Sequence, residues 1–238
     1  LVPTDVEQST AAAEWAFQLG YRTIFVIDDG STYGNGAAEL FEKRATELGM
    51  NIVNRIALET AGPLPEEESR LLADRMQALE VDLLYFSGAL AFDFVYSIRA
   101  IMPSVPVMVS DGLVHPEFIV SGDPNLIEGV YGTSVALPAG QLPASGDFAL
   151  RFQDTYGREP GPFAPVAYDA TKAVLTAIAQ AERPTSRNDV LQAMSELGEV
   201  NGLLGTWQFD QNGDITQWRV SGWQVQNGRW VFLESIVP

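Results

Sequence analysis

Hydrophobic and polar positions follow a repeating order along most of the chain: a short apolar run, a polar break, then an amphipathic segment. The clearest example begins with the apolar run Ile24–Ile27, which is interrupted by Asp28–Ser31. From Ala37 to Leu48, apolar residues then recur at helical spacing. Short apolar runs closed by turn residues are typical of buried parallel strands, and the later spacing is typical of a helix with one apolar face. The pattern therefore predicts a strand, a loop and a helix, which is half of a βαβ unit.

The same order predicts further strands at residues 51–58, 82–86, 106–109 and 129–135, with helices between them. A nearly apolar helix is expected at residues 166–181 and an amphipathic one at 188–197. Beyond residue 200 the character changes, because alternating runs flank Asn227-Gly228, a strong hairpin signal. We therefore expect an α/β fold, a doubly wound parallel sheet with a C-terminal antiparallel hairpin.

The first helix is predicted to begin at Thr4–Glu7, because these residues have the form of a capping box. It should run to about Leu19 and stop at Gly20, because glycine is favoured just after a helix. Helical spacing places four apolar residues on its inner face: Val6, Ala13, Ala16 and Phe17.

The charge and the cysteine content of the chain exclude several kinds of partner and several kinds of site. The chain has 31 acidic and 14 basic residues, which give a formal net charge of −17. Such a surface repels nucleic acid and anionic membranes, so we expect neither as a partner. No apolar run is long enough to span a membrane, and no N-terminal signal peptide is visible. The absence of cysteine excludes disulfides, thiol catalysis and cysteine metal ligands.

Three polar loops follow predicted parallel strands, at residues 28–34, 86–89 and 110–112. If the first, third and fourth strands are neighbours, these loops converge at the carboxyl edge of the sheet, where ligands bind in such folds. Small and polar residues suit a small-molecule ligand. The candidate ligand-binding residues are Tyr33, Ser87, Gly88, Ala89 and Asp111.

Each candidate also has a structural interpretation. Tyr33 packs over the helix start or contacts a ligand. Asp111 caps the turn that follows it, or offers a carboxylate to a ligand ammonium. Asp28 and Asp29 fit turn chemistry; a phosphoacceptor receiver domain is excluded, because no aspartate ends the third strand and no lysine ends the fifth.

No catalytic, metal or cofactor site is predicted. His115 is the single histidine, so a histidine metal site is not available, and we expect it to cap a helix or face solvent. Asp210–Asp214 resembles half a calcium loop, but its glycine is misplaced, so we interpret it as a hairpin turn. Phe148, Phe152 and Tyr156 are expected in the core. With no P-loop or dinucleotide fingerprint either, an enzyme on this scaffold remains only an alternative.

Three motifs in order along the chain carry a family resemblance: Tyr33-Gly-Asn-Gly, Tyr168-Asp-Ala-Thr-Lys and Gly205-Thr-Trp-Gln-Phe-Asp-Gln-Asn-Gly-Asp. The series resembles the type I periplasmic solute-binding proteins of ABC transporters, the Leu/Ile/Val-type receptors. The resemblance implies two α/β lobes that clamp a ligand and are joined by three crossovers. It also implies that Tyr33 and the loop Ser87–Ala89 face the ligand and that Asp111 holds its ammonium. Leucine-type receptors have an aromatic residue where Ala89 stands, so an amino acid or analogue is expected rather than a branched-chain one in particular.

The resemblance also implies a domain organisation. Leu1–Asp5 matches the first crossover, so residues 1–162 with 200–238 are expected to form the second, ligand-binding lobe. Helices within 163–199 would belong to a first lobe, of which roughly 100–130 residues, about one ordinary domain, have no counterpart. We expect a second copy to cover the apolar helices, and this chain alone to bind ligand poorly.

The expected protein is a periplasmic or extracellular receptor, lipid-anchored through a preceding segment, that delivers its ligand to a membrane permease. A ligand-sensing domain of a larger receptor is the alternative.

Overall fold

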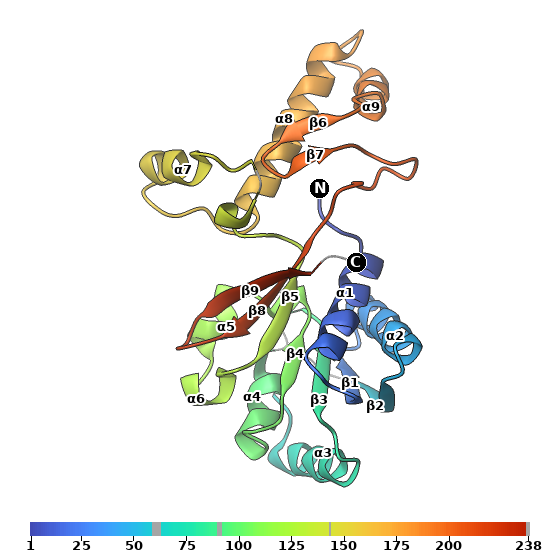
Figure 1. Cartoon of the computed structure of the whole chain (residues 1–238), viewed down its shortest axis with the longest axis vertical. Helices are drawn as coiled ribbons and strands as arrows, with labels where there is room; N and C mark the ends of the chain where they lie inside the picture. Colours follow the sequence, from blue (N-terminus) through green and yellow to red (C-terminus); the bar gives the residue numbers. More distant parts are fainter. Residues whose placement is uncertain (59–62, 90–91, 143, 237–238) are drawn as a thin grey trace. The chain divides into compact units, whose positions relative to one another are not determined.

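The computed structural model describes residues 1–58, 63–89, 92–142 and 144–236 (Figure 1). The chain forms two compact units. We call Asp5–Ser134 with Val220–Pro238 the sheet unit, and Leu1–Thr4 with Val135–Arg219 the helical unit.

The sheet unit holds seven strands in the order β2-β1-β3-β4-β5-β8-β9. The first five pair in parallel: β1 (Thr23–Asp28), β2 (Asn51–Ala57), β3 (Leu83–Ser87), β4 (Val107–Val109) and β5 (Tyr131–Ser134). The hairpin of β8 (Val220–Val225) and β9 (Trp230–Ile236) pairs antiparallel to β5. The expected sheet, the neighbouring first, third and fourth strands and the C-terminal hairpin are confirmed.

Helices cover both faces of this sheet, which makes it doubly wound (Figure 1). Helices α1 (Asp5–Gln18) and α2 (Thr32–Glu47) lie together on one face, where Phe41 stacks on Tyr85 of β3 with ring centroids 3.7 Å apart. Helices α3 (Glu66–Ala78) and α4 (Phe92–Ile101) bury their apolar sides against Phe25, Phe86 and other residues of the opposite face. The short helices η1 (Asp111–Leu113), α5 (Pro116–Ser121) and α6 (Pro124–Ile127) follow β4.

The inner face of α1 differs from the one expected. Val6 is 55% exposed, whereas Ala13 and Ala16 are buried as predicted. Trp15 is fully buried and donates its indole N–H to Glu234 Oε1 of β9 at 2.8 Å. This bond and the packing against α2 set the rotation of the helix, and they turn its first apolar residue to solvent.

The helical unit consists mainly of η2 (Ala139–Gln141), α7 (Phe148–Tyr156), α8 (Ala164–Gln180), α9 (Arg187–Ser195), β6 (Val200–Gly202) and β7 (Gly205–Trp207). The buried Asp169 of α8 accepts the N–H groups of Leu203 and Leu204 at 3.0 and 2.9 Å, which fixes the β6–β7 turn on the helix. Phe148 of α7 contacts Tyr168 of α8, with ring centroids 5.4 Å apart.

The compact units change over at 134/135 and 219/220. Helix α7 packs on α8 through Phe148, and Trp207 of β7 enters the apolar cluster around Ala173 of α8. Residues 135–162 and 200–219 therefore associate with the helices. These units do not test the lobe boundaries expected at 162/163 and 199/200, which stay a prediction. The assignment of these helices to a first lobe stays a prediction.

Candidate functional site

Tyr33 and Asp111 meet at the carboxyl edge of the sheet, although 78 positions separate them in the sequence. The Tyr33 hydroxyl donates to Asp111 Oδ1 at 2.5 Å. Tyr33 stands in the first turn of α2, whose N-cap Ser31 accepts the Gly34 N–H. Asp111 begins η1, where Ser110 occupies the cap position, so the Asp111 side chain is directed to Tyr33 rather than used as a cap.

The pair is partly withdrawn from water. Burial, together with the negative charge of Asp111 and the hydrogen bond to it, raises the pKa of the Tyr33 hydroxyl well above its usual range. Tyr33 is therefore a neutral donor at physiological pH. Burial raises the pKa of the nearby Tyr85 as well, so Asp111 faces two protonated phenols. Among described residues, the Asp111 carboxylate receives only the Tyr33 hydrogen bond, on Oδ1, which leaves Oδ2 for a further donor.

The loop Ser87–Ala89 lies beside this pair, with only its last residue at the surface. Ser87 is the final residue of β3 and is fully buried; Gly88 is buried, and Ala89 is exposed. The register of the strands places Ser87 beside Asp28 of β1. A Cβ on Gly112 would lie 2.4 Å from the Gly88 carbonyl oxygen, so the β3 and β4 loops pack against each other.

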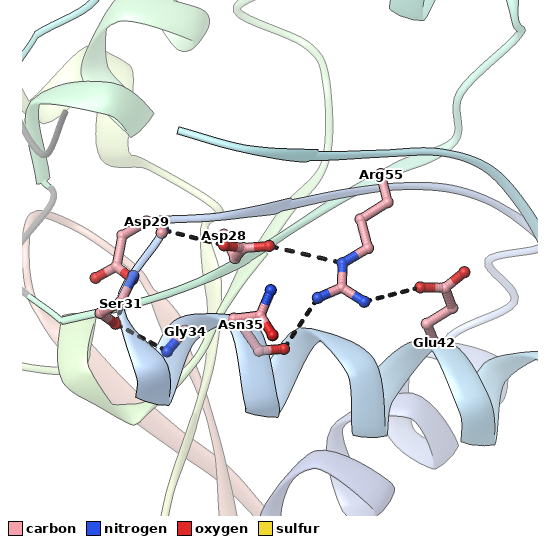
Figure 2. A network of polar contacts seen from close by, with 8 residues as sticks. Asp28, Asp29, Ser31, Gly34, Asn35, Glu42 and Arg55 are labelled. Carbon is pink, nitrogen blue, oxygen red and sulfur yellow. Dashed lines mark hydrogen bonds and ion pairs between the residues drawn. The ribbon is translucent and has the colours of Figure 1, made fainter. Parts of the chain in front are cut away.

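Below the loops, a polar network around the buried Asp28 holds the end of β1 (Figure 2). Asp28 is fully buried; its Oδ1 accepts the Gly30 N–H at 3.0 Å, and its Oδ2 lies 3.6 Å from Arg55 Nε. Arg55 also donates to the Asn35 carbonyl at 3.0 Å and to Glu42 at 3.3 Å. Asp28 is thus a structural residue, in agreement with its predicted turn role.

The remaining sequence candidates have structural roles, with one correction: of the aromatic residues expected in the core, Phe148 is buried, whereas Tyr156 is 64% exposed. The imidazole Nδ1 of His115 accepts the Glu117 N–H at 3.2 Å and caps α5, as predicted. Asp210 accepts the N–H groups of Asn212 and Asp214 in a hairpin turn, and these bonds lower the pKa of its carboxyl. Among the described residues, no group of acids and histidine could hold a metal ion, and no helix has the length and apolarity to cross a membrane.

Four residues near the site were not among the predicted ligand contacts. Gln8 of α1 is buried and lies 3.5 Å from the Tyr33 hydroxyl through its Nε2. Tyr85, Ser110 and Asp29 lie around the Tyr33–Asp111 pair or in the loops that carry it. The signal available for Asp29 and Ser110 was their place after a predicted strand; Gln8 gave none, because a polar residue on a helix is normally exposed.

A doubly wound parallel sheet defines the chain as an α/β protein of the class in which ligands bind where the strands end, and the carboxylate and phenol of the candidate site lie at that edge. The family model described as periplasmic binding protein matches residues 1–228, and the chain belongs to this family.

Comparison with individual proteins agrees with that membership. Leu/Ile/Val-binding protein homolog 1 of Brucella suis biovar 1 is 27% identical over 217 residues, which are 88% of this chain and 55% of that protein. The chain thus spans about half the length of the curated relatives it matches.

Two solved structures show the fold. The leucine binding protein LivK of Thermotoga maritima has a TM-score of 0.84 at 24% identity, covering 100% of this chain and 67% of that one. The solute binding protein of R. palustris in complex with benzoate has a TM-score of 0.75 at 17% identity, covering 100% of this chain and 64% of the other.

Proposed function

We propose that this chain is part or all of a solute-binding protein of an ABC transporter and binds an amino acid or close analogue without altering it chemically. The observation that carries the proposal is the Asp111 carboxylate, which Tyr33 holds at the carboxyl edge of the sheet. A ligand ammonium is the complementary group, because it can donate a charge-assisted hydrogen bond to the remaining oxygen.

The rest of the candidate site sets the kind of ligand. Ala89 is the exposed residue of its loop, and we assign the apolar contact to it; Ser87 and Gly88 form the loop beneath. Asp111 disfavours a ligand that carries only a carboxylate, because two like charges would meet in a partly desolvated place. The relative from Brucella is called Leu/Ile/Val-binding protein homolog 1 and that from Thermotoga a leucine binding protein, and these names support an amino acid as the ligand.

Membership of the family indicates which partner protein and which cellular location to expect. A periplasmic binding protein of this type would work outside the cytoplasm and pass its ligand to a membrane permease. We propose both for this protein, with anchoring by a lipid on a preceding segment. We also propose that residues 1–162 with 200–238 form the second lobe, and that helices within residues 163–199 belong to the first.

A second copy of the chain is a further proposed partner. The helical unit leaves several large apolar side chains exposed: Leu150, Tyr156, Tyr168, Leu175 and Leu191. Apolar surface of this kind on neighbouring helices favours association when nothing else covers it. A symmetric dimer of the 238-residue chain would cover both copies at once.

The test of the proposed function compares two ligands that differ in one group. Isothermal titration calorimetry of the full-length natural protein would measure L-leucine against 4-methylpentanoate, which lacks the amine; other amino acids are paired with their deaminated analogues in the same way. Removing the amine should weaken binding in the best pair by about thirtyfold to several thousandfold, since truncating one partner of a buried charge pair costs about 2–5 kcal/mol. Equal affinity, or preference for the acid without the amine, would show that Asp111 does not select the ligand.

A further inference from the structure

Two side chains outside the predicted ligand contacts tie together the loops that carry the candidate site. The first is Asp29, whose Oδ2 accepts the Ala89 N–H at 2.8 Å. Its Oδ1 accepts the N–H and the hydroxyl of Ser31 at 3.0 and 2.5 Å, just before helix α2 (Figure 2). One carboxylate therefore joins the start of the helix that carries Tyr33 to the loop that carries Ala89.

The second tie is Ser110, which is buried. Its hydroxyl accepts the Gly88 N–H and donates to the Gly88 carbonyl oxygen, each at 3.1 Å. Because Asp111 follows directly, this double contact joins the loop that carries Ala89 to the loop that carries the carboxylate.

Together with the bond from Tyr33 to Asp111, these contacts close a ring. Each of the three loops is bonded to the other two, through Asp29, through Ser110 and through the Tyr33 hydroxyl. A shift of one loop therefore breaks a bond to at least one of its neighbours.

Two glycines make room for the Asp29 carboxylate. A Cβ on Gly34 would lie 2.1 Å from Asp29 Oδ1, and one on Gly88 would lie 2.6 Å from its Cγ. Such distances are closer than real contacts allow, so larger residues at these positions would expel the carboxylate. The Ser31 bonds are ordinary turn chemistry, whereas the bond to Ala89 reaches 60 positions along the chain and is not needed for the turn.

We propose that Asp29 and Ser110 are positioning residues that hold Tyr33, Ala89 and Asp111 in the arrangement that binds ligand. The inference rests on the proposed function, because it takes these three residues as the contact surface. It adds two residues that touch no ligand and yet set the affinity.

The test begins with Asp29→Asn in the full-length natural protein. The asparagine keeps the size of the side chain, but it has one acceptor oxygen in place of two, so it cannot accept hydrogen bonds from both Ala89 and Ser31 in the way that Asp29 does. We expect calorimetry with the tightest-binding standard amino acid to show at least a tenfold loss of affinity. Hydrogen exchange of the Ala89 amide, which needs no ligand, should become at least tenfold faster.

A matched control separates positioning from stability. Tyr96→Phe removes a hydroxyl that donates to the Phe118 carbonyl at 2.7 Å, in the same unit but away from the site. It should lower the melting temperature and leave the affinity unchanged. A loss of affinity in Asp29→Asn that is no larger than in Tyr96→Phe would overturn the inference, and so would unchanged exchange at Ala89.

Two further variants complete the series. Ser110→Ala breaks the ring from the other side, so its effect on affinity should be less than additive with that of Asp29→Asn. It also carries the test if Asp29→Asn does not fold; wild-type affinity in Ser110→Ala would then contradict the inference. Asp111→Ala separates a failure of the proposed function from a failure of the positioning role. Unchanged affinity in Asp111→Ala refutes the proposed function. Lower affinity in Asp111→Ala together with wild-type affinity in Asp29→Asn refutes only the positioning role.

Discussion

The Asp111 carboxylate is oriented by one hydrogen bond and is not used as a helix cap. Ser110 stands at the N-cap position of the short helix, and the Tyr33 hydroxyl fixes one carboxylate oxygen of Asp111. Burial keeps Tyr33 protonated, so the phenol donates rather than repels. A carboxylate that is oriented before the ligand arrives loses less freedom on binding, which favours affinity.

Two glycines of helix α2 allow a matched test of the close packing around Asp29. Gly34→Ala would force its methyl group to within 2.1 Å of Asp29 Oδ1 and 2.9 Å of the Ser87 carbonyl oxygen. Overpacking of this kind should lower the free energy of unfolding by about 1–3 kcal/mol.

Gly36→Ala, two positions along the same helix, meets nothing within 4 Å. It should raise the free energy of unfolding by up to about 1 kcal/mol, because alanine favours a helix interior over glycine. Urea denaturation followed by circular dichroism measures both. If the urea midpoints of Gly34→Ala and Gly36→Ala shifted in the same direction, the close approach of Gly34 to Asp29 would be contradicted.

At the scale of elements, the carboxyl edge depends on strands that are anchored from below. Arg99 of α4 is buried and donates to three backbone carbonyls, those of Val105, Leu126 and Glu128, at 2.8–2.9 Å. Burial lowers the pKa of its guanidinium, but arginine remains charged. It thereby holds the segments before β4 and β5, and β4 leads into Asp111.

Arg99→Met keeps much of the apolar volume but leaves those three carbonyls without their donor. The free energy of unfolding should fall by about 3 kcal/mol or more, since each buried unsatisfied group costs about 1–3 kcal/mol and three carbonyls are affected. The control is Arg70→Met, which removes an exposed arginine paired with Glu66 on α3 and should leave the midpoint of thermal unfolding unchanged. Equal midpoints for the two variants would show that Arg99 does not anchor these segments.

The sequence was sufficient for the sheet and for the meeting of Tyr33 with Asp111, because local strand patterns and the rules of parallel sheets determine both. It was not sufficient for the buried Gln8, the exposed Val6 or the contact from Asp29 to Ala89. These depend on how α1 is rotated and on how loops pack between strands, which tertiary contacts decide. The boundaries of the compact units also depend on tertiary contacts, since the packing of α7 and of Trp207 on α8 has no local signature.

At the scale of the whole molecule, the exposed apolar side chains of α7, α8 and α9 predict self-association. The 238-residue chain should sediment as a dimer at micromolar concentration. Leu175→Glu, at a side chain that is 59% exposed, should yield monomers, because a charge in an apolar interface is costly.

The control is Val120→Glu on α5, a side chain that is 79% exposed in the sheet unit. It should leave the dimer intact. A wild-type chain that sediments as a monomer while α8 and α9 resist proteolysis would contradict the proposed dimer.

Whether Asp111 holds the ligand ammonium can be measured by calorimetry on two variants. In the full-length natural protein, Asp111→Ala should weaken the tightest-binding standard amino acid by about 2–5 kcal/mol. Asp74→Ala, which removes an exposed carboxylate on α3 of the same unit, should bind that amino acid as the wild-type protein does. Wild-type affinity in Asp111→Ala would show that Asp111 does not hold the ammonium and that the ligand binds elsewhere.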